Sequence, residues 1–325
     1  MSSDAPLLHR LRRSMRPAAL VDRPRSLWWR LRNDYRPLGD LTWPLAPGEL
    51  DGVRVEWPAT YHWPPSRTWL DPIRFGLALH VPVSVTDIAQ PAAPVALFVV
   101  WVDGARHEIA VDYSDYGDVD ETSRSRALLY FKMQYAVGGY DADGLVPGGY
   151  VPYNSELASV LGTLRRQGAP PRREVVYGRF SPNNDVRRRA AALLEEQRRF
   201  RYVGGLALQG YNAYLSGAVR SAVCIDLPGR GPICFRLIDY LAAGCCIVAL
   251  RHEAVLPVPL VDGVHIAYVD TPEDLVSRCA ELLDRPEQAL SLALGARDYF
   301  DRYLERRQLA AYYLAEILGR ARSTG

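Results

Sequence analysis

The order of apolar and polar residues is most regular after residue 174, where short apolar runs alternate with segments of helical spacing. Each run has the length of a short buried strand. The runs lie at 174–177, 201–203, 222–225, 246–250 and 266–269. Between them apolar residues recur every three or four positions, as at 186–200, which predicts amphipathic helices. Strands that alternate with helices in this way predict an α/β fold with a parallel, doubly wound sheet.

The first half of the chain has shorter and less regular blocks. Residues 53–57 alternate between apolar and polar, which predicts a strand. Two apolar runs flank Asp103-Gly104, a dipeptide that favours a tight turn. Glycine and proline gather at 148–154, so we place a domain boundary there. The predicted parts are an N-terminal arm (1–36), an N-terminal domain (37–155), a C-terminal domain (156–300) and a last helix (301–325).

Bulk composition narrows the functional classes. The 325 residues suffice for two domains, and 48% hydrophobic with 23% charged residues is typical of a globular protein. A formal net charge of +2 gives no global basic field, so we expect no nucleic-acid partner. The five cysteines lack the spacing of metal ligands, so we expect buried thiols in a reducing compartment. No apolar run approaches the ~18 residues of a membrane span, and we expect a cytoplasmic protein.

Residues 221–250 carry the most informative chemistry. A predicted strand is followed by a loop that contains Pro228, Gly229 and Gly231, and the loop leads into a helix. Glycines let the backbone approach a ligand, and the start of a helix offers unpaired N–H groups to an anion. Arg236 lies in the first helical turn, where a guanidinium can hold a phosphate, and Asp239 follows one turn later. The alternative is an ordinary turn with solvated Arg and Asp side chains.

This stretch resembles the donor-site segment of GT-B glycosyltransferases, and most closely the CgeB-like and exostosin-like groups. The resemblance covers about 174–285 well and the N-terminal half only loosely. The matching residues are Ser221, Pro228, Gly229, Arg236, Asp239, Gly244 and Cys245. It implies two Rossmann-like domains with an interdomain cleft, a C-terminal helix that crosses back to the first domain, and a nucleotide-diphosphate sugar as the donor substrate.

The resemblance also implies basic residues that hold the donor diphosphate. Arg179 follows the first strand of the second domain, and Arg187 starts the next helix. Retaining GT-B enzymes often carry two glutamates eight positions apart, but Gly231 and Asp239 stand at those positions here. The retaining mechanism is therefore not carried over from the resemblance, and inverting and retaining outcomes both stay open.

Candidate catalytic groups come from the N-terminal half. Asp112 and Asp115 follow a predicted strand, and a similar Asp-x-Ser-Asp in the CgeB-like group implies that one of them faces the cleft. An acceptor hydroxyl needs a general base, for which Asp115 is the first candidate, Asp112 the second and His107 the third. The alternative is that both aspartates cap the following turn. Lys132 and His252 are candidate contacts to the acceptor or to phosphate, and a lysine on a strand edge is the alternative for Lys132.

Three further segments allow two interpretations each. Residues 1–36 combine clustered arginines with Trp and Leu, which fits either a peripheral contact with an anionic membrane or an arm packed on the body. Aromatic residues at 61–69 form either a sugar-stacking wall or core. The amphipathic C-terminal region from 286 onward is either the crossing helix or the interface of a homodimer.

Together these features predict a glycosyltransferase that moves a sugar from a nucleotide-diphosphate sugar to a hydroxyl of a glycan, lipid or natural-product acceptor. We expect no cofactor and no metal. Asp141 and Asp143 form an Asp-x-Asp in a glycine-rich linker region, and we interpret it as a turn. The alternatives are another nucleotide-sugar enzyme such as an epimerase, and a catalytically inactive GT-B-like module that binds a nucleotide or polyanion.

Overall fold

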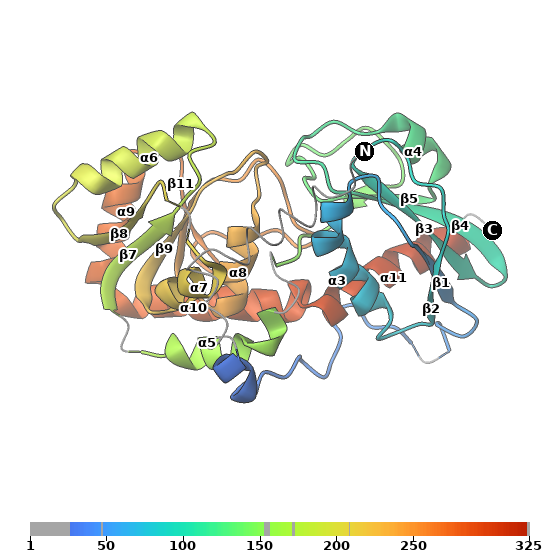
Figure 1. The fold of residues 1–325 in the computed structure, drawn as a ribbon, viewed down its shortest axis with the longest axis horizontal. Coiled ribbons are helices and arrows are strands. Elements are labelled where there is room, and N and C mark those ends of the chain that lie inside the picture. The colour runs from blue at the N-terminus through green and yellow to red at the C-terminus, as the bar shows by residue number, and fades with distance from the viewer. Residues whose placement is uncertain (1–26, 47, 153–156, 171–172, 208, 324–325) are drawn as a thin grey trace, which may run out of the picture.

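The computed structural model describes residues 27–46, 48–152, 157–170, 173–207 and 209–323. The chain builds two sheets that lie side by side in Figure 1, the first on the right and the second on the left. The first sheet has the strand order β2-β1-β3-β4-β5-β6 and the second has the order β11-β10-β9-β7-β8. The predicted fold class, α/β with two sheet-centred halves, is confirmed.

The second sheet is parallel throughout, as the alternation of strands and helices predicts. Its strands are β7 (Arg173–Arg179), β8 (Arg201–Gly205), β9 (Ser221–Asp226), β10 (Ile247–Leu250) and β11 (Ala267–Val269). The helices around it are α6 (Asp185–Glu196), α7 (Tyr211–Val219), α8 (Phe235–Ala243), α9 (Asp274–Asp284) and α10 (Pro286–Tyr299). Helices α6 and α9 contact each other, as do α7 and α8, so the two pairs cover different faces. Chain order within the sheet is 2-1-3-4-5, a common doubly wound arrangement.

The first sheet mixes parallel and antiparallel strands. Its strands are β1 (Arg54–Pro58), β2 (Val83–Thr86), β3 (Val95–Val102), β4 (Ala105–Asp112), β5 (Leu129–Lys132) and β6 (Leu145–Pro147). Strands β3 and β4 form the predicted hairpin, and both of its turn residues, Asp103 and Gly104, have positive φ angles, as a tight turn requires. Strands β4, β5 and β6 run parallel. The short helices of this half are 3-10 helix Pro64–Ser66, α3 (Arg67–Leu77) and α4 (Glu121–Arg126).

The end of the chain crosses from the second half to the first. Helix α10 packs against α8, a π-helical turn at Phe300–Leu304 follows, and α11 (Arg306–Ser323) packs against α3 (Figure 1). The Tyr313 ring stacks on Phe131 of β5 with 3.9 Å between the centroids, and its hydroxyl donates to the Gly148 carbonyl over 2.7 Å. The predicted crossing helix is therefore confirmed.

The start of the described chain lies on the second half before the chain enters the first half. Residues 27–35 pack on the second half, against 3-10 helix Leu157–Ser159 and α5 (Leu161–Gln167). Trp29 is buried there, and its carbonyl accepts a bond of 3.0 Å from the Thr163 hydroxyl. Of the two interpretations of the N-terminal arm, Trp29 thus fits the one in which the arm packs on the body. Most of the arm, 1–26, lies outside the described residues, as does Asn154 of the predicted linker. The division into four parts stays a prediction.

Candidate functional site

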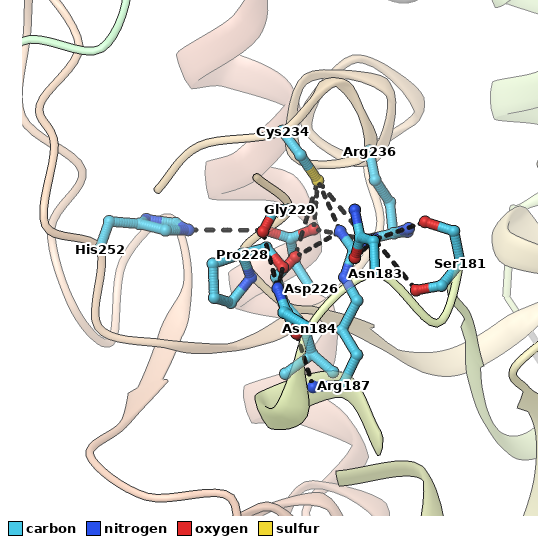
Figure 2. A network of polar contacts seen from close by, with 11 residues as sticks. Ser181, Asn183, Asn184, Arg187, Asp226, Pro228, Gly229, Cys234, Arg236 and His252 are labelled. Atoms are coloured by element: carbon cyan, nitrogen blue, oxygen red, sulfur yellow. Dashed lines mark hydrogen bonds and ion pairs between the residues drawn. The ribbon is translucent and has the colours of Figure 1, made fainter. Parts of the chain in front are cut away.

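The site lies at the point where the strand order of the second sheet reverses. Strand β7 pairs with β8 on one side and with β9 on the other. The chain therefore leaves β7 and β9 at the same end of the sheet but runs on toward opposite sides of it. Ligands of doubly wound sheets bind at this kind of switch point, outside the carboxyl ends of the strands. Here the loops at 180–184 and 227–234 meet and surround a network of polar side chains (Figure 2).

Arg187 is the most buried cation of this network. It lies in the first turn of α6 and is 3% exposed. One nitrogen donates to the Ser181 hydroxyl over 2.9 Å and to Asn183 Oδ1 over 3.0 Å, and another donates to the Leu227 carbonyl over 3.1 Å. All three acceptors are uncharged, and no ion pair joins Arg187 to a carboxylate in the described part of the chain. Burial lowers the pKa of Arg187, and the nearby charge of Arg236 lowers it further.

Arg236 enters the same network from the first turn of α8. Its Nη1 lies 3.5 Å from Asp226 Oδ1, and its guanidinium lies over the Phe180 ring at 4.8 Å from the centroid. Burial alone would lower the pKa of Arg236, but the neighbouring Cys234 and Asp226 outweigh burial and raise it. Arg236 therefore stays charged, although its contact with the carboxylate is long.

Asp226 is the carboxylate at the centre of the network. It ends β9, is fully buried, and accepts a weak bond of 3.5 Å from the Cys234 thiol. On its other side His252 Nε2 lies 3.5 Å from Asp226 Oδ2, and His252 Nδ1 lies 2.8 Å from the Tyr268 hydroxyl. Neither His252 Nε2 nor Asp226 Oδ2 has a hydrogen bond within the described residues. Burial raises the pKa of Cys234 to about 11, so this thiol is neutral at pH 7. One carboxylate thus faces two guanidinium groups, and the network carries excess positive charge.

Asn184 joins the two loops. Its Oδ1 accepts from the backbone N–H of Arg187 and caps α6, while its Nδ2 donates to the carbonyls of Pro228 and Gly229 at 3.1 and 2.7 Å. A Cβ at position 229 would lie 3.4 Å from Arg187 Nη2, close to an ordinary van der Waals contact. The N-cap of α8, Cys234, makes no side-chain cap bond, and within the first turn the Leu237 N–H donates to the Cys234 carbonyl over 3.0 Å.

The N-terminal half reaches the same loop through Gln134, which is 1% exposed. Gln134 Nε2 donates to the Ile233 carbonyl over 2.7 Å, and Gln134 Oε1 accepts from the Ile233 N–H over 3.1 Å. A Cβ at Gly231 would come within 2.6 Å of Gln134 Nε2 and 2.7 Å of the Asp115 carbonyl oxygen. Gly231 therefore permits close contact between the two halves, and Asp115 lies against the loop of the second half. Burial raises the pKa of Asp115, and the charge of Arg230 opposes this shift.

The residues after Gln134 reach a second loop of the same edge. The Tyr135 carbonyl accepts from the Val255 N–H over 2.8 Å, and the Val137 N–H donates to the Glu253 carbonyl over 3.1 Å. These bonds hold the loop that carries His252. One segment of the first half, 134–137, therefore positions two loops of the site.

We expect Gln134→Glu to lower the free energy of unfolding by ~1–3 kcal/mol at pH 7, because a carboxylate cannot donate to the Ile233 carbonyl and leaves it unpaired. The buried carboxyl would have a pKa above its usual value in the folded state, so this loss shrinks as the pH falls toward 4.5 and the acid regains a proton to donate. Denaturant unfolding at pH 5 and pH 7.5 measures this difference.

Gln90→Glu is a matched control, because Gln90 makes the same pair of bonds to the backbone of Leu97 entirely within the first half. Both variants should lose stability with the same pH trend. Only Gln134→Glu should also weaken the binding of a ligand at the second sheet. Equal ligand binding by both variants would show that Gln134 does not position the loop.

The structure brings together seven of the predicted site residues, places Arg179 beside them and separates the others. Those that meet at the two loops or at the edge between the halves are Arg187, Pro228, Gly229, Gly231, Arg236, His252 and Asp115. Ser221 lies at the opposite end of β9, about 17 Å along the strand, and donates to the Gly217 carbonyl. Asp239 is buried under α7, where it accepts from the Tyr211 hydroxyl over 3.0 Å. Arg179 ends β7 beside the site, with a buried Nε that has no hydrogen bond among the described residues.

Two candidate residues of the first half, Lys132 and Asp112, form an ion pair with each other. Lys132 is fully buried, and its Nζ lies 2.7 Å from Asp112 Oδ2, which also accepts from the Tyr130 hydroxyl over 2.7 Å. Burial raises the pKa of Asp112, and Lys132 opposes this shift. Asp112 Oδ1 accepts from the Ser114 N–H, which is the turn-capping bond of the alternative interpretation. Neither side chain can reach a ligand without breaking this pair.

Several residues of the network carry no prediction from the sequence. Asp226 directly follows a predicted strand, and the rule that ligands lie at carboxyl ends of strands is a signal for it. Asn184 precedes a predicted helix and is a typical N-cap residue. Gln134 had no signal, because its contact with Ile233 joins residues far apart in the chain. Among the described residues no group of three or more His, Cys, Asp or Glu side chains is arranged to hold a metal ion. None of the helices in the same ranges is both long and apolar enough to cross a membrane.

Comparisons with known proteins add little. No family model matches the chain. No curated protein matches it in sequence. Among solved structures, the chain is similar to the C-terminal domain of a glycosyl transferase group 1 family protein (LpcC) from Francisella tularensis, with a TM-score of 0.32 and 11% identity over 42% of this chain and 89% of that domain. The similarity is coarse and concerns the fold alone.

Proposed function

We propose that the protein is a glycosyltransferase that uses a nucleotide-diphosphate sugar. The observation that carries the proposal is the convergence of Arg187 and Arg236 at the switch point of the second sheet, where Asp226 is the one carboxylate that pairs with either of them among the described residues. A buried guanidinium without a carboxylate partner is costly, and a bound anion offsets this cost. A diphosphate supplies the missing negative charge at the site where doubly wound sheets bind nucleotides.

Each cation has a separate task in this proposal. Arg236 forms only a long contact with Asp226, so it can turn one N–H toward a phosphate oxygen. The start of α8 adds its positive dipole end. Arg187 supplies the electrostatic field from beneath the loop. Together they stabilise the charge that grows on the diphosphate as it leaves, and in this proposal they take the place of a metal ion.

The acceptor would be activated from the first half. Its hydroxyl oxygen attacks the anomeric carbon, the bond between that carbon and the diphosphate oxygen breaks, and the hydroxyl proton passes to a base. Asp115 is the proposed base because it is half-buried, lies against the loop of the second half and has a raised pKa. Asp112 is not proposed for this role, since Lys132 and Tyr130 already bind its carboxylate.

A thermal-shift panel of nucleoside diphosphates and their sugars tests the donor site. One of them is expected to raise the melting temperature of the wild-type protein, because a ligand at a hundredfold excess over its Kd stabilises the folded state by ~2.7 kcal/mol. Arg236→Ala should abolish most of this shift. Arg189→Ala is the control, since Arg189 also lies on α6 but is exposed and pairs with Glu273.

Two results would count against the proposal. If no nucleotide shifts the wild-type protein, the site does not bind a nucleotide-diphosphate donor. If the shift is the same in Arg236→Ala and in wild type, the nucleotide binds elsewhere. Loss of the shift in Arg189→Ala as well would indicate a general loss of stability rather than a specific contact.

A further inference from the structure

A short helix at 27–31 turns an apolar face to solvent. Leu27 is 60% exposed, Trp28 47% and Leu31 77%. A helix advances by 100° per residue, so positions 27, 28 and 31 fall within about one quarter to one third of its circumference. The three large side chains therefore form one continuous apolar face, which we call the 27–31 face.

The 27–31 face is held firmly on the body of the protein. Trp29 points the opposite way and is 2% exposed, and its carbonyl accepts from the Thr163 hydroxyl. Asn33 donates to the Ala158 carbonyl over 3.0 Å and accepts from the Gly162 N–H over 2.8 Å. A Cβ at Gly162 would collide with the backbone nitrogen of Tyr35 at 2.6 Å. The apolar side chains are thus presented by a packed segment, which lowers the entropy cost of binding to them.

Positive charge surrounds the 27–31 face. Arg30 and Arg32 are exposed, and the Arg32 guanidinium lies over the Trp28 ring at 4.8 Å from its centroid. The nearest acid along the chain, Asp34, is paired with Arg166. The 26 residues that precede this helix contain six arginines, two aspartates and no glutamate. The sequence that continues from the face therefore carries more of the same charge.

We propose that the 27–31 face docks on an anionic lipid surface. Trp and Leu side chains enter the region between headgroups and acyl chains, while arginines contact lipid phosphates, as in other interfacial helices. A contact with a second copy of this chain fits the charges less well, because two-fold symmetry would place the Arg30 and Arg32 side chains of both copies close together. The proposal is independent of the proposed enzymatic activity.

Sedimentation with lipid vesicles tests this proposal on the full chain. Wild-type protein is expected to pellet with vesicles of phosphatidylglycerol and phosphatidylcholine at 100 mM NaCl, and much less with phosphatidylcholine alone or at 500 mM NaCl. Leu27→Ser/Leu31→Ser should weaken the partition coefficient by about tenfold or more, because both leucines would enter the interface. The control is Leu290→Ser/Leu294→Ser, which removes two partly exposed leucines (39% and 55%) from α10.

Four results would overturn the proposal. One is that wild-type protein fails to bind the anionic vesicles. Another is that the Leu27→Ser/Leu31→Ser variant binds as well as wild type, which would also be the result if residues 1–26 cover the face. Equal weakening by the α10 control would be a third. The last is a wild-type dimer in analytical ultracentrifugation that Leu27→Ser/Leu31→Ser dissociates, which would make the face an interface between copies.

Discussion

Lys132→Met is expected to lower the free energy of unfolding by about 3–5 kcal/mol, because it leaves the buried carboxylate of Asp112 without its partner. The methionine fills much of the space of the lysine stem, so the loss reports charge rather than a cavity. Urea unfolding at pH 7 measures it. Replacing both partners with uncharged residues, in Asp112→Asn/Lys132→Met, should restore most of the loss, since no buried charge remains and the introduced amide oxygen can still accept from the Ser114 N–H.

The pH dependence of the Lys132→Met variant follows from the sign of the Asp112 shift. Burial raises the pKa of Asp112 in the folded protein even beside Lys132, and removing the lysine raises this pKa further. A carboxyl whose folded pKa is raised contributes most stability below its unfolded pKa of about 4 and loses it as the pH rises. The variant should therefore be closest to wild type near pH 4 and furthest from it at pH 7. A deficit that is independent of pH would show that packing, not charge, holds this pair.

Asp115→Asn is expected to lower the turnover of the donor by about 10²- to 10⁴-fold, the usual contribution of a general base, while the donor-induced thermal shift remains. The measurement is release of nucleoside diphosphate in the presence of an acceptor, with and without a chelator. We expect the chelator to have no effect, because the arginines carry the charge that a metal would supply. The control is Asp118→Asn, which alters an exposed aspartate of the same loop.

This experiment also separates a transferase from a binding module. A module that only binds a nucleotide shows the thermal shift but no turnover in the wild-type protein. In a transferase the base acts when deprotonated, so turnover rises with pH as Asp115 ionises. Because burial raises the pKa of Asp115, this rise should lie at a higher pH than for an ordinary aspartate. Full turnover in Asp115→Asn would remove Asp115 from the mechanism.

The second half of the fold could be predicted from the sequence because its signals are local. Each strand is a short apolar run, Gly244 ends α8 in the left-handed conformation, and Asn184 caps α6. In the first half the Asp103-Gly104 turn identified the hairpin, but the position of β1 between β2 and β3 did not follow from any local pattern. Pairing of that kind depends on which strands bury one another's side chains, and those contacts are distant in the chain.

The candidate site was predictable to the extent that strand ends and glycines mark it. Arg187, Gly229 and Arg236 follow from the rule that ligands bind at the carboxyl ends of strands. The role of Lys132 does not follow from this rule, because the same hydrophobic segment is compatible with a lysine that contacts a ligand and with a lysine that pairs with Asp112. Only the parallel pairing of β4 and β5, which places Asp112 opposite Lys132, decides between them. Ser221 lies away from the site because it starts β9, and the site forms at the other end of that strand.

Residues 27–35 pack on the second half and α11 packs on the first half, and this arrangement has a consequence for synthesis. Residues 27–35 need α5, which the ribosome delivers more than a hundred residues later, and the first sheet needs Tyr313 of α11, which is delivered long after the strands of that sheet. Domains that are contiguous in the chain can fold as they emerge, but the first half of this protein is not complete until α11 has been synthesised. Loop closure over such separations is slow, so the nascent chain exposes the apolar surface around Phe131 until α11 arrives to cover it.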